Sequence, residues 1–187
     1  MKIEIVPYNS DWPGEFEKVA AELSNALGDL ATRIDHIGST SVPGLAAKDI
    51  IDVQISVSRF YPELEQRLTS IGYLFWKDIT SDHKPPLYAG TEDEWEKRLY
   101  QAPADHRRAN IHVRIQGRLN QRYALLFRDF LRSHPYIAQA YAEVKRRLAS
   151  YLGEDREAYT EIKDPVCDVI MAAAEEWAGR TGWKSAA

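Results

Sequence analysis

The stretch IDHIGSTSVPGLAAKDIIDVQISV, residues 34–57, decides the fold. It holds two apolar runs with a loop of small residues between them. In the second run, apolar residues alternate with Asp52, Gln54 and Ser56, and a period of two is typical of a strand with one apolar and one polar face. We therefore expect the Gly38-Ser39 turn to lie close to the carboxylate of Asp52. Such a turn can offer backbone N–H groups and a hydroxyl to a phosphate, and a strand carboxylate can hold a divalent cation beside it.

The segment HIGSTSVPGLAAKDIID (36–52) resembles the GrpB family and, through it, the nucleotidyltransferase superfamily of the DNA polymerase beta type. The superfamily signature is Gly-Ser followed by Asp-x-Asp or Asp-x-Glu on a strand, with a third carboxylate on a later strand. The resemblance covers nearly the whole chain, continuing through ANIHVRIQG, LLFRDFLRSHP, YAEVKRRLA and AYTEIK. It implies a nucleotidyltransferase-like mixed β-sheet with packed helices and a C-terminal helical bundle. A similar domain occurs fused to some dephospho-CoA kinases.

Composition indicates a single globular domain. The chain has 187 residues, 44% of them hydrophobic, and a net charge of −4, which argues against a general nucleic-acid binder. Residues 118–147 nevertheless carry seven basic and two acidic side chains and could form a basic face. The single cysteine, Cys167, excludes an internal disulfide. No apolar run is long enough to span a membrane and the first residues do not resemble a signal peptide, so we expect a cytoplasmic protein without membrane contact.

The order of the expected elements favours the α+β class, because most strands precede most helices. We expect strands at 2–6, 34–37, 49–57, 73–76, 97–102 and 110–116, and helices at 13–32, 61–71, 118–134, 135–153 and 156–178. Residues 78–95 form a long irregular segment of the kind that is often functional or mobile. We expect one domain, residues 1–187, within which 118–180 could form a helical subdomain.

The last helical region carries a proline and a clear apolar pattern. Asp164-Pro165 predicts a kink or a break into two helices. The apolar residues expected to face inward are Val166, Val169, Ile170, Ala173 and Trp177.

The strand carboxylate and its partners give the main site hypothesis. The resemblance makes Asp52 the catalytic carboxylate and a metal ligand, whereas the residues alone favour a capping Asp or a partner for Lys48. Gln54 occupies the place of the second acid, and the later strand offers His112 and Arg114. Two-metal chemistry requires clustered carboxylates, so this set is more typical of an anion or nucleotide cradle. The alternative is a site for a single Mg²⁺ ion that arrives bound to a nucleoside triphosphate.

The other candidate ligands are small or basic residues. Gly38, Ser39 and Thr40 could bind phosphate, and the alternative is an ordinary turn with a capping serine. Lys48 could reach the same phosphates or be an exposed lysine. His112 could carry a proton, contact a ligand, or be hydrogen-bonded on a half-buried surface.

Three further basic residues are implied by the resemblance alone. It places Arg128, Lys145 and Lys163 at the cleft, whereas their spacing would assign them to the surface.

The candidate site residues and the resemblance suggest two functions, and a third function ranks last. The leading hypothesis is a nucleotidyltransferase-like protein that binds a nucleotide or another phosphorylated small molecule and, if catalytic, transfers a nucleotidyl group with Mg²⁺. The alternative is a non-catalytic module for a nucleotide or CoA-like ligand, with a degenerate metal site. An RNA-binding accessory role for the basic face at 118–147 ranks last, so nucleic acid is not the expected partner. The sequence leaves the oligomeric state open.

Overall fold

A mixed five-stranded sheet forms the centre of the part of the chain that the structure, a computed structural model, describes (residues 2–185). In spatial order its strands are β1 (Arg33–Ile37), β2 (Ile51–Val57), β5 (Ala109–Ile115), β4 (Arg98–Gln101) and β3 (Leu74–Phe75). β2 and β5 are parallel, and the other neighbouring pairs are antiparallel. The register places Asp52 opposite Asn110 and Gln54 opposite His112. Paired residues of adjacent strands point to the same face, so the polar residues of β2 and β5 share one face.

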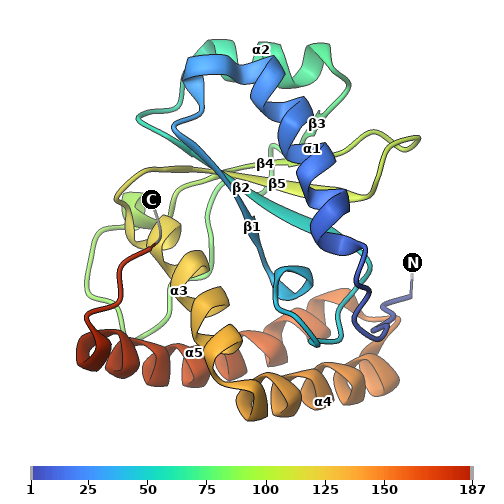
Figure 1. Cartoon of the computed structure of the whole chain (residues 1–187), viewed down its shortest axis with the longest axis vertical. Coiled ribbons are helices and arrows are strands. Elements are labelled where there is room, and N and C mark those ends of the chain that lie inside the picture. Colours follow the sequence, from blue (N-terminus) through green and yellow to red (C-terminus); the bar gives the residue numbers. More distant parts are fainter. Residues whose placement is uncertain (1, 186–187) are drawn as a thin grey trace.

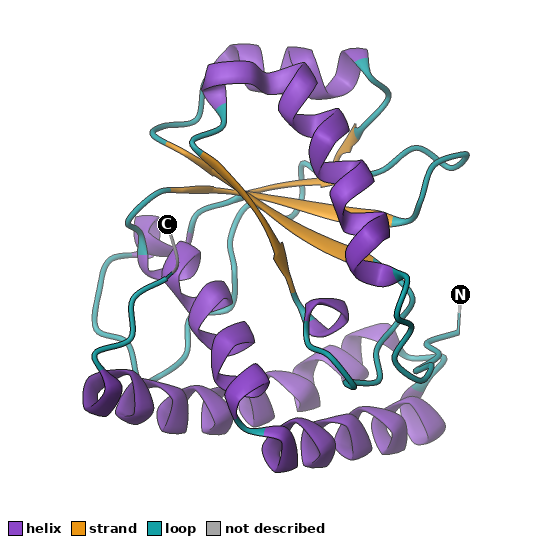
Figure 2. Cartoon of the chain, in the orientation of Figure 1, coloured by secondary structure: helices purple, strands orange, loops and turns teal. Residues whose placement is uncertain are grey.

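Helices pack on both sides of this sheet (Figures 1 and 2). They are α1 (Trp12–Leu27), α2 (Pro62–Ser70), α3 (Leu119–Ser133), α4 (Pro135–Leu152) and α5 (Arg156–Thr181). α1 and α2 lie together on one side, and α3, α4 and α5 pack against one another on the other side. The predicted α+β class with a C-terminal helical bundle is confirmed. Among the described residues, no helix is both long and apolar enough to cross a membrane.

Two large hydrophobic clusters hold these layers together, and a small third one joins Ile3 to Ala149 and Tyr159. The first packs α1 and α2 on the apolar face of the sheet and includes Trp12, Leu23 and Ile55. The second is the core of the helical bundle, and it also contains Val42, Leu45 and Ala46 from the loop that follows the Gly-Ser turn. Burying an aliphatic side chain of this size stabilises a fold by about 1.5–3 kcal/mol. The loop at 42–46 is therefore anchored in the bundle, which fixes the Gly-Ser turn between bundle and sheet.

The polar face of β2 is covered by α3 at Gln54 and Ser56, beyond the part that carries Asp52. Gln54 Nε2 donates to the carbonyl of Gln121 at 3.2 Å, and Gln121 Nε2 donates to Ser56 Oγ at 3.3 Å. These bonds satisfy polar groups that would otherwise be buried without partners. The alternation of apolar and polar residues along β2 therefore produces an apolar face against α1 and α2 and a polar face toward α3.

The expected strand at residues 2–6 is wrong. Val6 forms only an isolated bridge with Ala47, because its partner lies in an irregular loop and offers no ladder to extend. The segment is held at its other end, where the N–H of Ile3 donates to the carbonyl of Gly153 at 2.7 Å.

Of the two outcomes expected at Pro165, the break into two helices is wrong, since α5 continues through this residue, and the kink stays a prediction. Proline removes the N–H that would bond the carbonyl of Glu161. Both residues are exposed, so water can reach that carbonyl. Packing of the flanking turns against α3 and α4 then keeps the two halves in one helix.

The inward face of α5 matches the expected one in part, since Val166 and Trp177 pack against the bundle core as predicted. Val169 is 74% exposed and Ala173 is exposed as well, while Ile170 is buried as predicted. The buried residues on the inward face are Tyr159, Cys167, Ile170, Met171, Ala174 and Ala178. Apolar residues occur on both faces of this helix, so spacing alone could not set its rotation.

Candidate functional site

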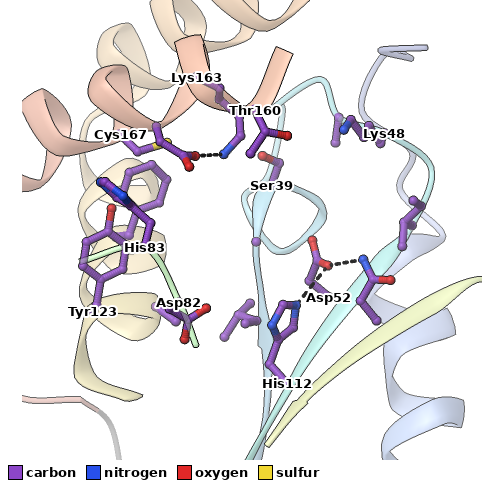
Figure 3. A pocket seen from close by; sticks show the side chains of 18 of the residues that line it. Ser39, Lys48, Asp52, Asp82, His83, His112, Tyr123, Thr160, Lys163 and Cys167 are labelled. Carbon is purple, nitrogen blue, oxygen red and sulfur yellow. Dashed lines mark hydrogen bonds and ion pairs between the residues drawn. The ribbon is translucent and has the colours of Figure 1, made fainter. Parts of the chain in front are cut away.

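A cavity of about 500 Å³ lies where the polar residues of the sheet meet the helical bundle (Figure 3). Its lining comes from the loop after β1, from β2 and β5, from the segment at residues 81–83, and from α3, α4 and α5. Nine of the eleven predicted site residues line it: Gly38, Ser39, Thr40, Lys48, Asp52, His112, Arg114, Lys145 and Lys163. The structure thus brings together residues that are up to 125 positions apart in the chain.

The Gly-Ser turn and Asp52 are packed so closely that only glycine fits at position 38. Gly38 has a φ of +69° and a ψ of −172°, a conformation that is essentially restricted to glycine. A Cβ at this position would overlap the Oδ2 atom of Asp52 and lie 2.9 Å from the Asp52 Cβ. Gly38 is therefore needed both for the shape of the turn and for the place of the carboxylate.

The environment of Asp52 favours its charged form. Its Oδ1 accepts a hydrogen bond from Asn110 Nδ2 at 3.0 Å and lies 3.6 Å from His112 Nε2. Burial alone would raise the pKa of Asp52, but His112 and Asn110 outweigh it and lower that pKa below its usual value. Burial, together with the charges of Arg114 and Lys97, lowers the pKa of His112 despite its contact with Asp52. The pair is therefore a carboxylate beside a neutral imidazole at neutral pH.

The donors around Asp52 do not fit a two-metal centre. Gln54, at the place of the second acid, is fully buried away from the cavity lining, and its Oε1 accepts from Arg114 Nη1 at 2.7 Å. Asp82 lines the cavity, but its carboxylate is bound by Arg114, Lys97 and Asn120. No group of three or more His, Cys, Asp or Glu side chains within residues 2–185 could hold a metal ion.

The buried network under the cavity is organised by Asp82. Arg114 Nε and Nη2 donate to its two oxygens at 2.8 and 3.0 Å, and Lys97 Nζ donates at 2.7 Å. Burial would raise the pKa of Asp82, but Arg114 and then Lys97 hold it well below its usual range. Two cations share one carboxylate here, so the network keeps a positive excess facing the cavity.

Lys145 is the most buried of the lysines in the lining, with 4% of its surface exposed. Its Nζ donates to Ser39 Oγ at 2.7 Å and to the carbonyl of Ala46 at 2.6 Å, and it lies 4.7 Å from the centroid of the Tyr141 ring. Burial lowers its pKa to about 7. Lys145 thus ties α4 to the Gly-Ser turn and titrates near neutral pH.

Two more lysines complete the cationic side of the cavity (Figure 3). Lys48 Nζ lies 4.3 Å from the centroid of the Tyr159 ring, and burial followed by the charges of Arg156 and Lys163 lowers its pKa to about 8. Lys163 pairs with Asp164 at 2.8 Å. The positive charges of Lys48, Lys163 and Arg156 repel one another. An anion that enters the cavity would relieve this repulsion.

The lining has five basic side chains and three carboxylates, although the whole chain has a net charge of −4. The basic residues are Lys48, Lys97, Arg114, Lys145 and Lys163, and the carboxylates are Asp52, Asp82 and Asp164. The cavity is therefore an anion-attracting region of an acidic protein.

Two predicted site residues have structural partners instead of lining the cavity. Gln54 belongs to the buried network described above. Arg128 donates to Asp129 Oδ1 at 2.7 Å and to the carbonyl of His36 at 3.1 Å, so it ties α3 to β1. Thr40 does line the cavity, but its hydroxyl lies 3.0 Å from His36 Nε2 and donates to the carbonyl of Ile50 at 3.4 Å.

Sequence reasoning missed several lining residues. Asp82 and Trp95 come from the irregular segment at residues 78–95, which was singled out only as a whole. Asn110 could have been found, because it precedes His112 and Arg114 at a spacing of two on the same strand. Lys97 and Asn120 have no local pattern that marks them.

The fold and the site together define a class of protein: an α+β domain with a Gly-Ser turn against a strand carboxylate and a cationic cavity between sheet and bundle. Comparison with known proteins narrows this class. Residues 2–173 match the family described as GrpB protein, and the chain belongs to the GrpB family.

Individual relatives support this assignment. The crystal structure of the conserved protein GrpB from Enterococcus faecalis has a TM-score of 0.76 and 27% identity, and it covers 93% of this chain and 99% of that one. A dephospho-CoA kinase of Mycolicibacterium paratuberculosis is 35% identical over 97% of this chain but 48% of its own length. The chain thus spans about half the length of the dephospho-CoA kinases it matches. The Cid1 poly(U) polymerase bound to MgATP is a distant likeness, with a TM-score of 0.48 and 10% identity over 80% of this chain and 44% of that one.

Proposed function

We propose that this protein binds a nucleotide or a similar phosphorylated small molecule in the cavity between its sheet and its helical bundle. The observation that carries the proposal is the convergence of Lys48, Lys145 and Lys163 near Ser39, in a lining with excess positive charge. Lysine ammonium groups and a serine hydroxyl are suitable donors to phosphate oxygens. The Gly-Ser turn adds backbone groups from a rigidly placed loop.

The binding requires no metal ion in this proposal. Asp52 is a charged carboxylate in the lining, and its partners within residues 2–185 are Asn110 and His112 and not a lysine or arginine. It would therefore repel a phosphate in direct contact and accept a hydrogen bond from a ligand hydroxyl instead. The phosphates then lie toward the lysines and a sugar hydroxyl toward Asp52. A Mg²⁺ ion carried by a triphosphate would find Asp52 as its protein carboxylate.

Nucleotidyl transfer to a hydroxyl is the second candidate. It is favoured by the tight packing of Gly38 against Asp52, because such packing fixes a carboxylate beside the phosphate-binding turn. In this function the lysines would also neutralise charge that develops on the leaving phosphates. The surrounding donors, with Gln54 and Arg114 at the places of further acids, favour binding over efficient transfer.

The dephospho-CoA kinase relatives add ligands to test. Because the chain matches about half of those proteins, it could work beside an enzyme that handles CoA-like molecules. CoA and dephospho-CoA both combine a nucleotide with a diphosphate. They therefore belong in the same panel as the nucleoside triphosphates.

A thermal-shift panel tests the proposal. Nucleoside triphosphates, CoA and dephospho-CoA are each added with and without Mg²⁺, since a ligand that binds only the native state raises Tm. We expect at least one phosphorylated ligand to raise Tm without Mg²⁺. A shift that requires Mg²⁺, followed by release of pyrophosphate, would support transfer instead. Absence of any shift in a folded, cooperatively melting protein would contradict the binding proposal.

A further inference from the structure

The two oxygen atoms of the Asp52 carboxylate have different surroundings. Oδ1 accepts a hydrogen bond from Asn110 Nδ2 at 3.0 Å and lies 3.6 Å from His112 Nε2 (Figure 3). Within residues 2–185, Oδ2 has no hydrogen-bond partner and is not a buried atom, and the Asp52 side chain as a whole is 29% exposed. Asp52 therefore has one oxygen that the protein holds and one that a molecule in the cavity can reach.

The accessible oxygen lies beside the Gly-Ser turn. A Cβ at Gly38 would overlap Asp52 Oδ2, and both Gly38 and Ser39 line the cavity. In Figure 3 the Asp52 oxygen without a dashed line points toward Ser39. Ser39 Oγ in turn accepts from Lys145 Nζ at 2.7 Å. A ligand with a phosphate at Ser39 and the lysines would thus bring the neighbouring part of its own structure to Oδ2.

The contacts of His112 fix which of its ring nitrogens carries the proton. Arg114 Nη2 lies 3.5 Å from His112 Nδ1. A guanidinium can donate hydrogen bonds but cannot accept them, so Nδ1 must be the acceptor. The neutral imidazole then carries its proton on Nε2, which faces Asp52 Oδ1.

Arg114 can orient His112 because its own guanidinium is held from two sides. Nε and Nη2 donate to the two oxygens of Asp82 at 2.8 and 3.0 Å, and Nη1 donates to Gln54 Oε1 at 2.7 Å. Every contact in this chain has one direction, from Arg114 to His112 and from His112 to Asp52. The buried network therefore sets the position of the Asp52 carboxylate in the cavity.

We propose that Asn110 and His112 are positioning residues, which hold Asp52 Oδ1 so that Oδ2 accepts a hydrogen bond from a sugar hydroxyl of the ligand. This inference rests on the proposed function and deepens it, because it names the ligand class as nucleotides with a free ribose hydroxyl. A site built to pair with a hydroxyl rejects an analogue that lacks it, since the carboxylate then loses water without gaining a partner.

Calorimetric titration of the wild type without Mg²⁺ tests the ligand class. The probes are ATP, GTP, CTP and UTP, the 2′-deoxy and 3′-deoxy form of each, and tripolyphosphate. A hydrogen bond to a charged group changes affinity by roughly ten- to a hundredfold. We expect the ribonucleotide that binds most tightly to lose this factor in one of its two deoxy forms.

Variants of His112 test the positioning role. His112→Leu removes the donor to Asp52, whereas His112→Gln can keep an N–H at the place of Nε2. His106→Leu is the matched control, because His106 is 38% exposed and lies outside the cavity lining. We expect His112→Leu to lose the preference for the ribonucleotide and still bind tripolyphosphate, and we expect the preference to persist in His112→Gln and His106→Leu.

The ¹⁵N shifts of the His112 ring in the wild type provide a test that needs no ligand. We expect the tautomer with the proton on Nε2 at neutral pH, and a proton on Nδ1 would overturn the inference. Equal affinity for ribonucleotides and both deoxy forms, or a preference that survives His112→Leu, would overturn it as well and leave the phosphate site in place. If neither tripolyphosphate nor any triphosphate binds the folded protein, the proposed function fails and this inference fails with it.

Discussion

The close packing of Gly38 against Asp52 makes a quantitative prediction for Gly38→Ala. The backbone at Gly38 is in a region that costs other residues on the order of 1–3 kcal/mol. The added Cβ would also overlap Asp52 Oδ2 and lie 2.9 Å from the Asp52 Cβ, and overpacking typically costs a further ~1–3 kcal/mol. We therefore expect the free energy of unfolding to fall by about 2–6 kcal/mol, measured by urea denaturation.

The same structure supplies the controls. Gly44 also has a positive φ, +78°, but nothing lies within 4 Å of the place where its Cβ would be. Gly44→Ala should therefore cost only the backbone strain, roughly 1–2 kcal/mol. Combining Gly38→Ala with Asp52→Ala removes the overlap with the Asp52 carboxylate but keeps the 2.9 Å contact with the Cβ of residue 52. The double variant should therefore be more stable than the sum of the single effects by only part of the overpacking cost, about 1 kcal/mol. Equal losses for the two glycines, together with additive effects in the double variant, would refute the claim that Gly38 is reserved for the carboxylate.

Two further predictions concern the charged groups under the cavity. Anion affinity should decline as the pH rises from about 6 to 9, because the pKa values of Lys145 and Lys48 are about 7 and 8 and each lysine loses its charge above its pKa. The titratable and charged groups that face Lys145 are Cys167, Lys163, Arg146, Asp52 and Tyr141. Calorimetry on Lys145→Gln should show a shallower decline than the wild type, because the ionisation of the ligand is common to both, and identical slopes would count against the assignment. Arg114→Met should destabilise the fold by about 3–5 kcal/mol by leaving Asp82 buried with less compensation. In the wild type the pKa of Asp82 is lowered, so its contribution is present above the unfolded pKa of about 4 and is lost as the pH falls below it; an acid-denaturation profile that Arg114→Met leaves unchanged would disagree.

Local patterns in the sequence were enough to predict the part of the site that is built locally. Alternation along β2 and the small residues before it predicted that Asp52 and the Gly38-Ser39 turn would meet, and both line the cavity. The parallel pairing of β2 with β5 then brings His112 to Asp52. The contact between Asp52 and the turn depends on strand periodicity and on a single loop, which short-range spacing encodes, whereas the approach of His112 depends on the pairing of two strands that are far apart in the chain.

The features that depend on long-range pairing could not be predicted in this way. Lys145 is buried because acceptors 106 and 99 residues earlier, Ser39 Oγ and the carbonyl of Ala46, are brought to it. Asp82 and Arg114 are 32 residues apart across an irregular segment. The prediction for α5 failed at Val169 for a related reason. Val169 is apolar but exposed, and only the packing partners decide which of the apolar residues on this helix are buried.

The most direct test of the proposed phosphate-binding site is calorimetric titration, without Mg²⁺, of the ligand that gives the largest thermal shift. The proteins are the wild type, Lys163→Gln in the cavity lining, and Lys18→Gln on the exposed surface of α1 as the matched control. A charge-assisted hydrogen bond contributes about 1.5–3 kcal/mol, so Lys163→Gln should weaken binding by roughly ten- to a hundredfold while Lys18→Gln leaves it unchanged. Equal affinity in all three proteins would contradict the claim that the cavity between sheet and bundle is the phosphate-binding site.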